Sequence, residues 1–213
     1  EWCFGWAGND SDECADAVDA SYIYFGWVLD RVGDEYGLQD VGALLGLVAA
    51  LPGVDPSYIP DHAEGAPQLI AAMTAAVTKP ELIQGILTND NSLMQKAVDS
   101  DISGSVVAGN GNGGGDTVYR FREGIERFMI TDINNPAASA QAQSEVFVMF
   151  DQIATSVGDF NHVPGGANTL FLDGHVEFIR CQAFPGGTAP ANAGVAGILG
   201  IVARMTLSGG VVP

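Results

Sequence analysis

The side chains best suited to chemistry in this chain are oxygen-rich ones between residues 132 and 173. They fall at the ends of expected elements, in turns and approach loops: Asp132, Asn134, Asp151, Asn161, His162, Asn168 and Asp173. Carboxylate and amide oxygens are the ligands that Ca²⁺ prefers, and loops supply them with flexible geometry. One interpretation is therefore a Ca²⁺ site, with Asp132, Asn134, Asp151 and Asp173 as its ligands.

The same residues have a structural interpretation, which we favour. Asp and Asn side chains accept hydrogen bonds from nearby backbone N–H groups, so Asp132 and Asp151 fit Asx-turns and Asp173 fits a tight turn. His162 would then pin a loop to the backbone. In this interpretation the polar set holds a corner of the fold together.

The N-terminal segment offers a second set of acids and two cysteines. Asp10, Asp12, Glu13, Asp16 and Asp19 do not follow the spacing of an EF-hand loop, so a solvated acidic stretch is favoured over a metal site. Cys3 and Cys14 are candidates for a local disulfide if the compartment is oxidising. Cys181 would then be free, buried or paired differently, because spacing alone does not settle connectivity.

Catalytic patterns are weak in this chain. There is no Gly-x-Ser-x-Gly sequence, and none of the three histidines, His62, His162 and His175, stands in a recognised triad context. His175 and Glu177 are two residues apart, a spacing typical of neighbours along one strand. The cysteines form no zinc pattern either. We therefore expect no enzymatic activity.

Charge excludes other classes of function. The 213 residues carry 26 acidic and 8 basic side chains, a formal net charge of −18, while apolar residues make up 47%. The apolar content predicts a folded core, and the charge repels phosphate backbones and anionic lipids. We expect neither nucleic-acid binding nor a membrane span, since no apolar run reaches 18 residues.

A β-hairpin is the clearest local prediction. Asp173-Gly174 is a two-residue turn of the type that requires positive φ at both central positions. Pairing about this turn sets Phe171 opposite Val176 and Thr169 opposite Phe178. Thr169, Phe171, Val176 and Phe178 would then share the core face, with His175 and Glu177 on the other face.

The hairpin segment also resembles a known family. Residues 160–180 are similar to the C-terminal signature of the prepilin-type, processing-associated His-x9-Asp-Gly proteins, which are pilin-like exported proteins. The motif residues are His162, Gly165, Gly166, Asn168, Asp173 and Gly174, followed by His175, Val176 and Phe178. Residues 123–151 and 21–30 resemble earlier blocks of that family. Ten residues separate His162 from Asp173, one more than the family's name implies.

The resemblance implies an extracellular or cell-surface structural subunit, a filament or pseudopilus component that contacts other copies of itself, with Ca²⁺ as an optional stabiliser. It also implies a leader and a long apolar helix upstream of Glu1, through which alone the protein would meet a membrane. The alternative is a monomeric exported binding module, in which aromatic side chains stack on a glycan: Trp2, Phe4, Trp6, Tyr22, Tyr24 and Trp27.

The expected fold class is α+β. An antiparallel sheet would contain residues 21–29, 117–121, 145–150 and the hairpin at about 169–180, with a helical insertion at about 40–98. Residues 1–186 would form the head domain. Residues 187–213 would form a small-residue-rich tail for subunit contact, in which Gly194, Gly197 and Gly200 allow close approach to a supporting surface.

Overall fold

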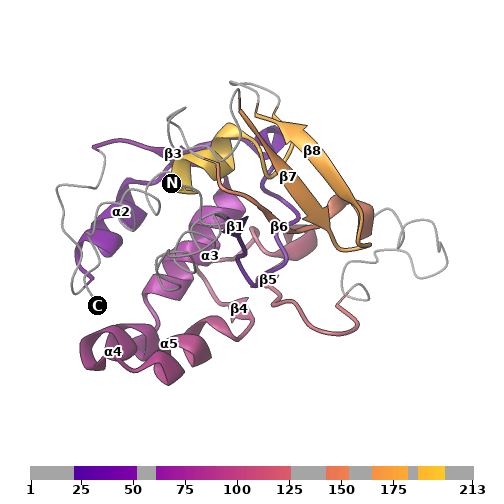
Figure 1. Cartoon of the computed structure of the whole chain (residues 1–213). Helices are drawn as coiled ribbons and strands as arrows, with labels where there is room; N and C mark the ends of the chain where they lie inside the picture. Colours follow the sequence, from indigo (N-terminus) through magenta and orange to yellow (C-terminus); the bar gives the residue numbers. More distant parts are fainter. Residues whose placement is uncertain (1–21, 52–60, 126–142, 154–164, 182–186, 200–213) are drawn as a thin grey trace, which may run out of the picture.

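The computed structural model describes residues 22–51, 61–125, 143–153, 165–181 and 187–199 (Figure 1). It confirms the α+β class, with an antiparallel sheet and a C-terminal hairpin. The four-stranded sheet has the order β1 (Tyr22–Ile23), β6 (Phe147–Asp151), β7 (Gly166–Phe171) and β8 (Val176–Arg180). In Figure 1 the sheet lies on one side of the molecule and the helices α2, α4 and α5 lie away from it.

The expected strand at 21–29 is divided between two partners. Gly26 has φ +75°, a backbone conformation that interrupts an extended strand. Before it, β1 pairs with β6. After it, Val28 N–H donates to Tyr119 O at 2.8 Å and Trp27 bridges to Arg120. The prediction that residues 117–121 join the main sheet was therefore wrong, because β5 (Thr117–Val118) pairs with β4 (Ile102–Ser103) in a separate ribbon.

The hairpin forms, but its register differs by one residue from the prediction. Leu170 pairs with Val176 and Thr169 with Glu177. Gly174 has φ +89°, and it is the only residue of the Asp173-Gly174 pair with positive φ. Gly174 N–H donates to Phe171 O at 2.9 Å, which closes a longer turn than the two-residue one expected. A one-residue shift exchanges the faces of a strand, so Val176 and Phe178 are exposed and Ile179 is buried.

The helices lie where sequence signals put them. They are α2 (Gly42–Ala49), α3 (Pro67–Val77), α4 (Pro80–Thr88) and α5 (Asn91–Val98). Proline occupies the first turn of α3 and α4, where its missing N–H costs nothing. Asp90 caps α5 by accepting from Ser92 N–H and Leu93 N–H. Asp40 lies one residue before Val41, the N-cap of α2, and accepts from Gly42 N–H at 2.8 Å.

The core lies between the inner face of the sheet and α3. Its members come from most of the described chain outside α4 and α5, including Leu29, Leu69, Phe147, Phe150 and Ile179. Trp27 belongs to this core and donates its indole N–H to Ser100 O at 2.9 Å. The buried indole N–H of Trp27 is thus hydrogen-bonded, as burial requires.

The described part of the tail packs against the head. Residues 193–199 are helical, and Val195, Ile198 and Leu199 are buried. Gly197 faces Glu64 of β3 (Glu64–Gly65), the strand that pairs with β2 (Gln39–Asp40), and Gly194 faces Leu38 and Ala66 beside these strands. A side chain at Gly197 would collide with Glu64 O. The expectation of close approach at these glycines is confirmed, and the supporting surface is a strand.

This packing predicts opposite effects of Gly→Ala at two helical sites. Gly197→Ala should lower the free energy of unfolding by about 1–3 kcal/mol, because the new methyl group meets Glu64 O. Gly46→Ala in α2 points into open space and should raise it by about 0.5–1 kcal/mol. Urea denaturation midpoints at constant slope measure both changes. Equal effects at the two sites would contradict the close approach.

Candidate functional site

Two adjacent glycines of the predicted motif, Gly165 and Gly166, are each required by the structure for a different reason. Gly165 has φ +113°, a conformation that side chains rarely adopt. Gly166 lies at the start of β7 beneath the ring of Phe178, and a Cβ there would approach within 2.5 Å of the ring's Cζ atom. Phe178 therefore covers the first residue of β7 on the outer face of the sheet. These glycines shape the hairpin, and the structure gives them no contact with a reacting group.

Asp151 and Asn168 form the polar corner of this hairpin. Asp151 is 4% exposed, and its Oδ2 accepts from both the backbone N–H and the side-chain Nδ2 of Asn168, each at 2.8 Å. Because Asp151 ends β6 and Asn168 lies early in β7, this pair fixes the register where the two strands meet. These bonds join Asp151 to a residue 17 positions later in the chain, whereas the predicted Asx-turn would join it to a near neighbour.

Asp173 works at the opposite end of the hairpin. Its carboxylate accepts from His175 N–H at 3.0 Å and contacts His175 Nδ1. The hydrogen bond from the His175 backbone, followed by that from its ring, lowers the pKa of Asp173. The His175 ring stacks on Phe171 with the centroids 4.4 Å apart. The turn is thus held by a local Asp–His–Phe arrangement at the surface.

The structure keeps apart the two predicted calcium ligands that it describes, Asp151 and Asp173. Asn168, the partner of Asp151, is separated from Asp173 by the rest of β7, and three residues of strand already span about 10 Å. One ion with ligands at roughly 2.3–2.6 Å does not reach both carboxylates. Asp132 and Asn134 lie outside the described residues. Within the described residues, no group of three His, Cys, Asp or Glu side chains is placed to hold a metal ion.

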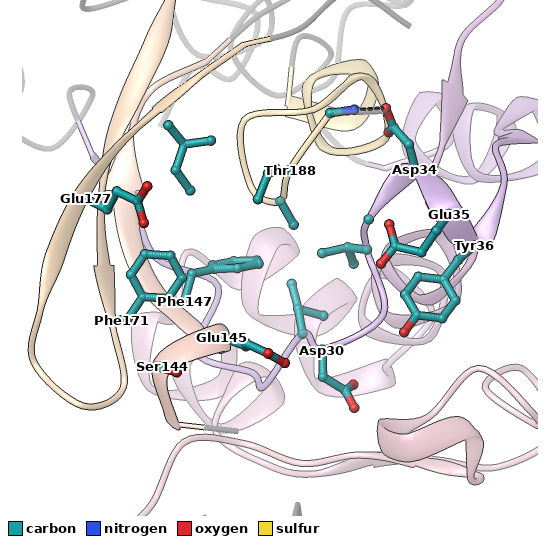
Figure 2. Close-up of a pocket in the computed structure, with 16 residues that line it drawn as sticks. Asp30, Asp34, Glu35, Tyr36, Ser144, Glu145, Phe147, Phe171, Glu177 and Thr188 are labelled. Carbon is teal, nitrogen blue, oxygen red and sulfur yellow. Dashed lines mark hydrogen bonds between the residues drawn. The ribbon is translucent and has the colours of Figure 1, made fainter. Parts of the chain in front are cut away.

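An acidic cleft that sequence reasoning missed lies beside the sheet (Figure 2). It has a volume of about 780 Å³, and its described lining contains five carboxylates, from Asp30, Asp34, Glu35, Glu145 and Glu177. None of its described lining residues is Lys, Arg or His. Apolar side chains separate these acids, among them the rings of Phe147 and Phe171. We call this feature the acidic cleft.

Two of the cleft's carboxylates are fixed by hydrogen bonds. Asp34 Oδ2 accepts from Gly187 N–H at 2.8 Å, the dashed line in Figure 2. Asp30 accepts from Gln68 Nε2 at 2.8 Å, from Asn112 Nδ2 at 2.7 Å and from Gly113 N–H at 2.9 Å. All of these donors are neutral, so the negative charges of the two side chains are oriented by these bonds but not cancelled by them.

A second surface feature is the outer face of the four-stranded sheet. The register aligns Met149, Leu170 and Val176 in one row across three strands. Tyr22 pairs with Asp151 and so lies on the same face. Val176 is 63% exposed, Tyr22 50%, Phe178 47% and Met149 38%. We call these residues, with Leu170, the outer sheet face.

Several predicted residues remain to be placed. His162, Cys3, Cys14, Trp2, Phe4 and Trp6 lie outside the described residues. Trp27 is buried and so is not available to stack on a glycan, which leaves Tyr22 and Tyr24 as the exposed members of that cluster. Cys181 is a free thiol, and burial raises its pKa. No helix in the described ranges is long and apolar enough to cross a bilayer.

The hydrogen bonds of Asp151 predict that its substitution lowers the free energy of unfolding more than a substitution of Asp173 does. Asp151→Ala should lower the free energy of unfolding by about 1–3 kcal/mol, because it removes the acceptor shared by two Asn168 donors. Asp173→Ala serves as the control at an exposed turn and should lower the free energy of unfolding by less than Asp151→Ala does. Chemical denaturation measures both. A larger loss for Asp173→Ala would refute the structural role given to Asp151.

Comparison of the chain with known proteins adds no assignment. No family model matches the sequence, and no curated protein and no solved structure matches it either. The resemblance to pilin-like exported proteins therefore stays a prediction from the motif residues.

Proposed function

We propose that this protein is an extracellular, pilin-like structural subunit that associates with other copies of itself through the outer sheet face. The observation that carries this proposal is an apolar surface on one side of a sheet whose other side is already covered by the core. Exposed apolar patches of this kind mark interaction sites in soluble proteins.

Charge supports a second copy as the partner. The chain carries a net charge of −18, so two copies repel each other over most of their surfaces. The outer face of the sheet is an exception. Its one acid, Asp151, is 4% exposed and hydrogen-bonded by Asn168, and Arg180 lies on the same face at its edge. Contact between two such faces therefore buries apolar area with little like-charge repulsion.

Calcium does not enter this proposal. The described candidates, Asp151 and Asp173, act at opposite ends of the hairpin, and each has a hydrogen-bonding role there. Assembly would depend on apolar contact, which strengthens with apolar area buried at roughly 25 cal/mol per Å² before the entropic cost of association.

A pair of double variants tests the proposal. Met149→Glu with Val176→Glu places two negative charges on the outer sheet face of each copy, and like charges across an interface cost several kcal/mol. We expect the dissociation constant for self-association to rise at least tenfold in sedimentation equilibrium, with filaments lost in electron micrographs. Both positions are exposed, so the fold should be retained.

The matched control is Leu87→Glu with Val106→Glu. These apolar residues are 66% and 47% exposed but lie outside the sheet, so the same change in charge should leave assembly unchanged. Equal loss in both double variants would mean that net charge alone governs association. A parent chain that stays monomeric, with tryptophan fluorescence quenched by added sugars, would favour the binding module instead.

A further inference from the structure

The acidic cleft has no role in the proposed assembly, because its described lining comes from the inner side of the hairpin and from the segments 29–36, 144–147 and 187–189. We propose that it binds a linear polyamine, a chain of methylene groups carrying separated ammonium charges. A volume of about 780 Å³ falls within the range of roughly 300–1,000 Å³ typical of small-molecule sites. The ligand class follows from how charge and apolar surface are arranged within that volume.

The carboxylates are spread around the cleft rather than gathered at one point. Glu177 stands on β8 at one wall, and Glu35 stands on the opposite wall, in η1 (Asp34–Tyr36) (Figure 2). Glu145 and Asp30 lie between them in the same view. Among the described residues no three acids come close enough to share a metal ion. The arrangement therefore suits a cation whose charges are held apart.

The surface between these acids is apolar. Leu29, Val32 and Ile179 line the cleft together with Phe147 and Phe171. Methylene groups gain by contact with such a surface, whereas a hydrated divalent ion gains nothing from it. A peptide would bury amide groups that need hydrogen-bond partners, at a cost that a polyamine backbone avoids. The apolar residues between the acids thus match the methylene groups of a polyamine. The separated carboxylates match its ammonium groups.

The walls are also prepared for cations. Glu35 folds back over Gly33, where a Cβ would collide with the carboxylate. The guanidinium of Arg31 lies over the ring of the neighbouring Tyr36, 4.8 Å from the ring centroid. Arg31 itself is not part of the described lining. Asp30 and Asp34 are oriented by their hydrogen-bond donors. Little rearrangement is required before a ligand binds.

Spermidine is the probe for this proposal, and isothermal titration calorimetry on the full chain is the measurement. We expect saturable binding of one spermidine per chain. Glu35→Gln with Glu177→Gln should weaken it about tenfold, because two partly exposed charge contacts are lost. Both residues are exposed, and equal melting temperatures of parent and variant would show that the fold is intact.

The control has the same change in charge elsewhere. Asp61→Asn with Glu123→Gln removes two exposed acids that do not line the cleft, and binding should stay within twofold of the parent. Mg²⁺ supplied at the same total concentration of positive charge as spermidine should displace little spermidine from the cleft. The proposal fails if spermidine does not bind, if both double variants weaken it equally, if magnesium displaces it fully, or if trilysine binds more tightly than spermidine.

Discussion

The carboxylate of Asp30 is the interaction on which the arrangement of the described elements most depends. It accepts from Gln68 on α3, from Asn112 and from Gly113, so it joins three segments far apart in sequence. Gln68 in turn accepts from Arg31 N–H, and Asn112 Oδ1 accepts from Tyr119 N–H. With Gln68 1% exposed, loss of the carboxylate would leave a buried amide without an acceptor. The segment 28–31, α3 and the glycine-rich loop 110–116 are positioned together by this network.

That network explains why one part of the fold could not be predicted from the sequence. Residues 110–116 have the composition of a flexible loop, yet Asn112 and Gly113 bind Asp30, and Asn112 also donates to Val28 O. Nothing local in NGNGGGD indicates this contact, because its partners lie more than 80 residues away. The helices were predictable for the opposite reason. Pro67, Pro80 and Asp90 act within their own first turns, so a short window of sequence contains the whole signal.

The hairpin shows how a correct local prediction still misplaced side chains. Asp173-Gly174 indicates a turn, but only the hydrogen bonds of Phe171 with Gly174 and His175 fix its length. The one-residue shift in register decides whether Val176 and Phe178 lie in the core or on the surface. The corner formed by Asp151 and Asn168 was predictable, since both residue types favour such roles. The acidic cleft was not, because its acids come from three separate stretches of chain and become neighbours only after folding.

The sheet order has a consequence at the level of the backbone. Within the described residues β8 has β7 on one side and borders no further strand, so one row of its N–H and C=O groups forms an edge. Edges of this kind are templates for strand addition, which leads to uncontrolled aggregation. β8 is five residues long and includes Glu177 and Arg180, both exposed. Short length and charge discourage pairing along this edge, and the proposed self-association through the outer sheet face does not use it.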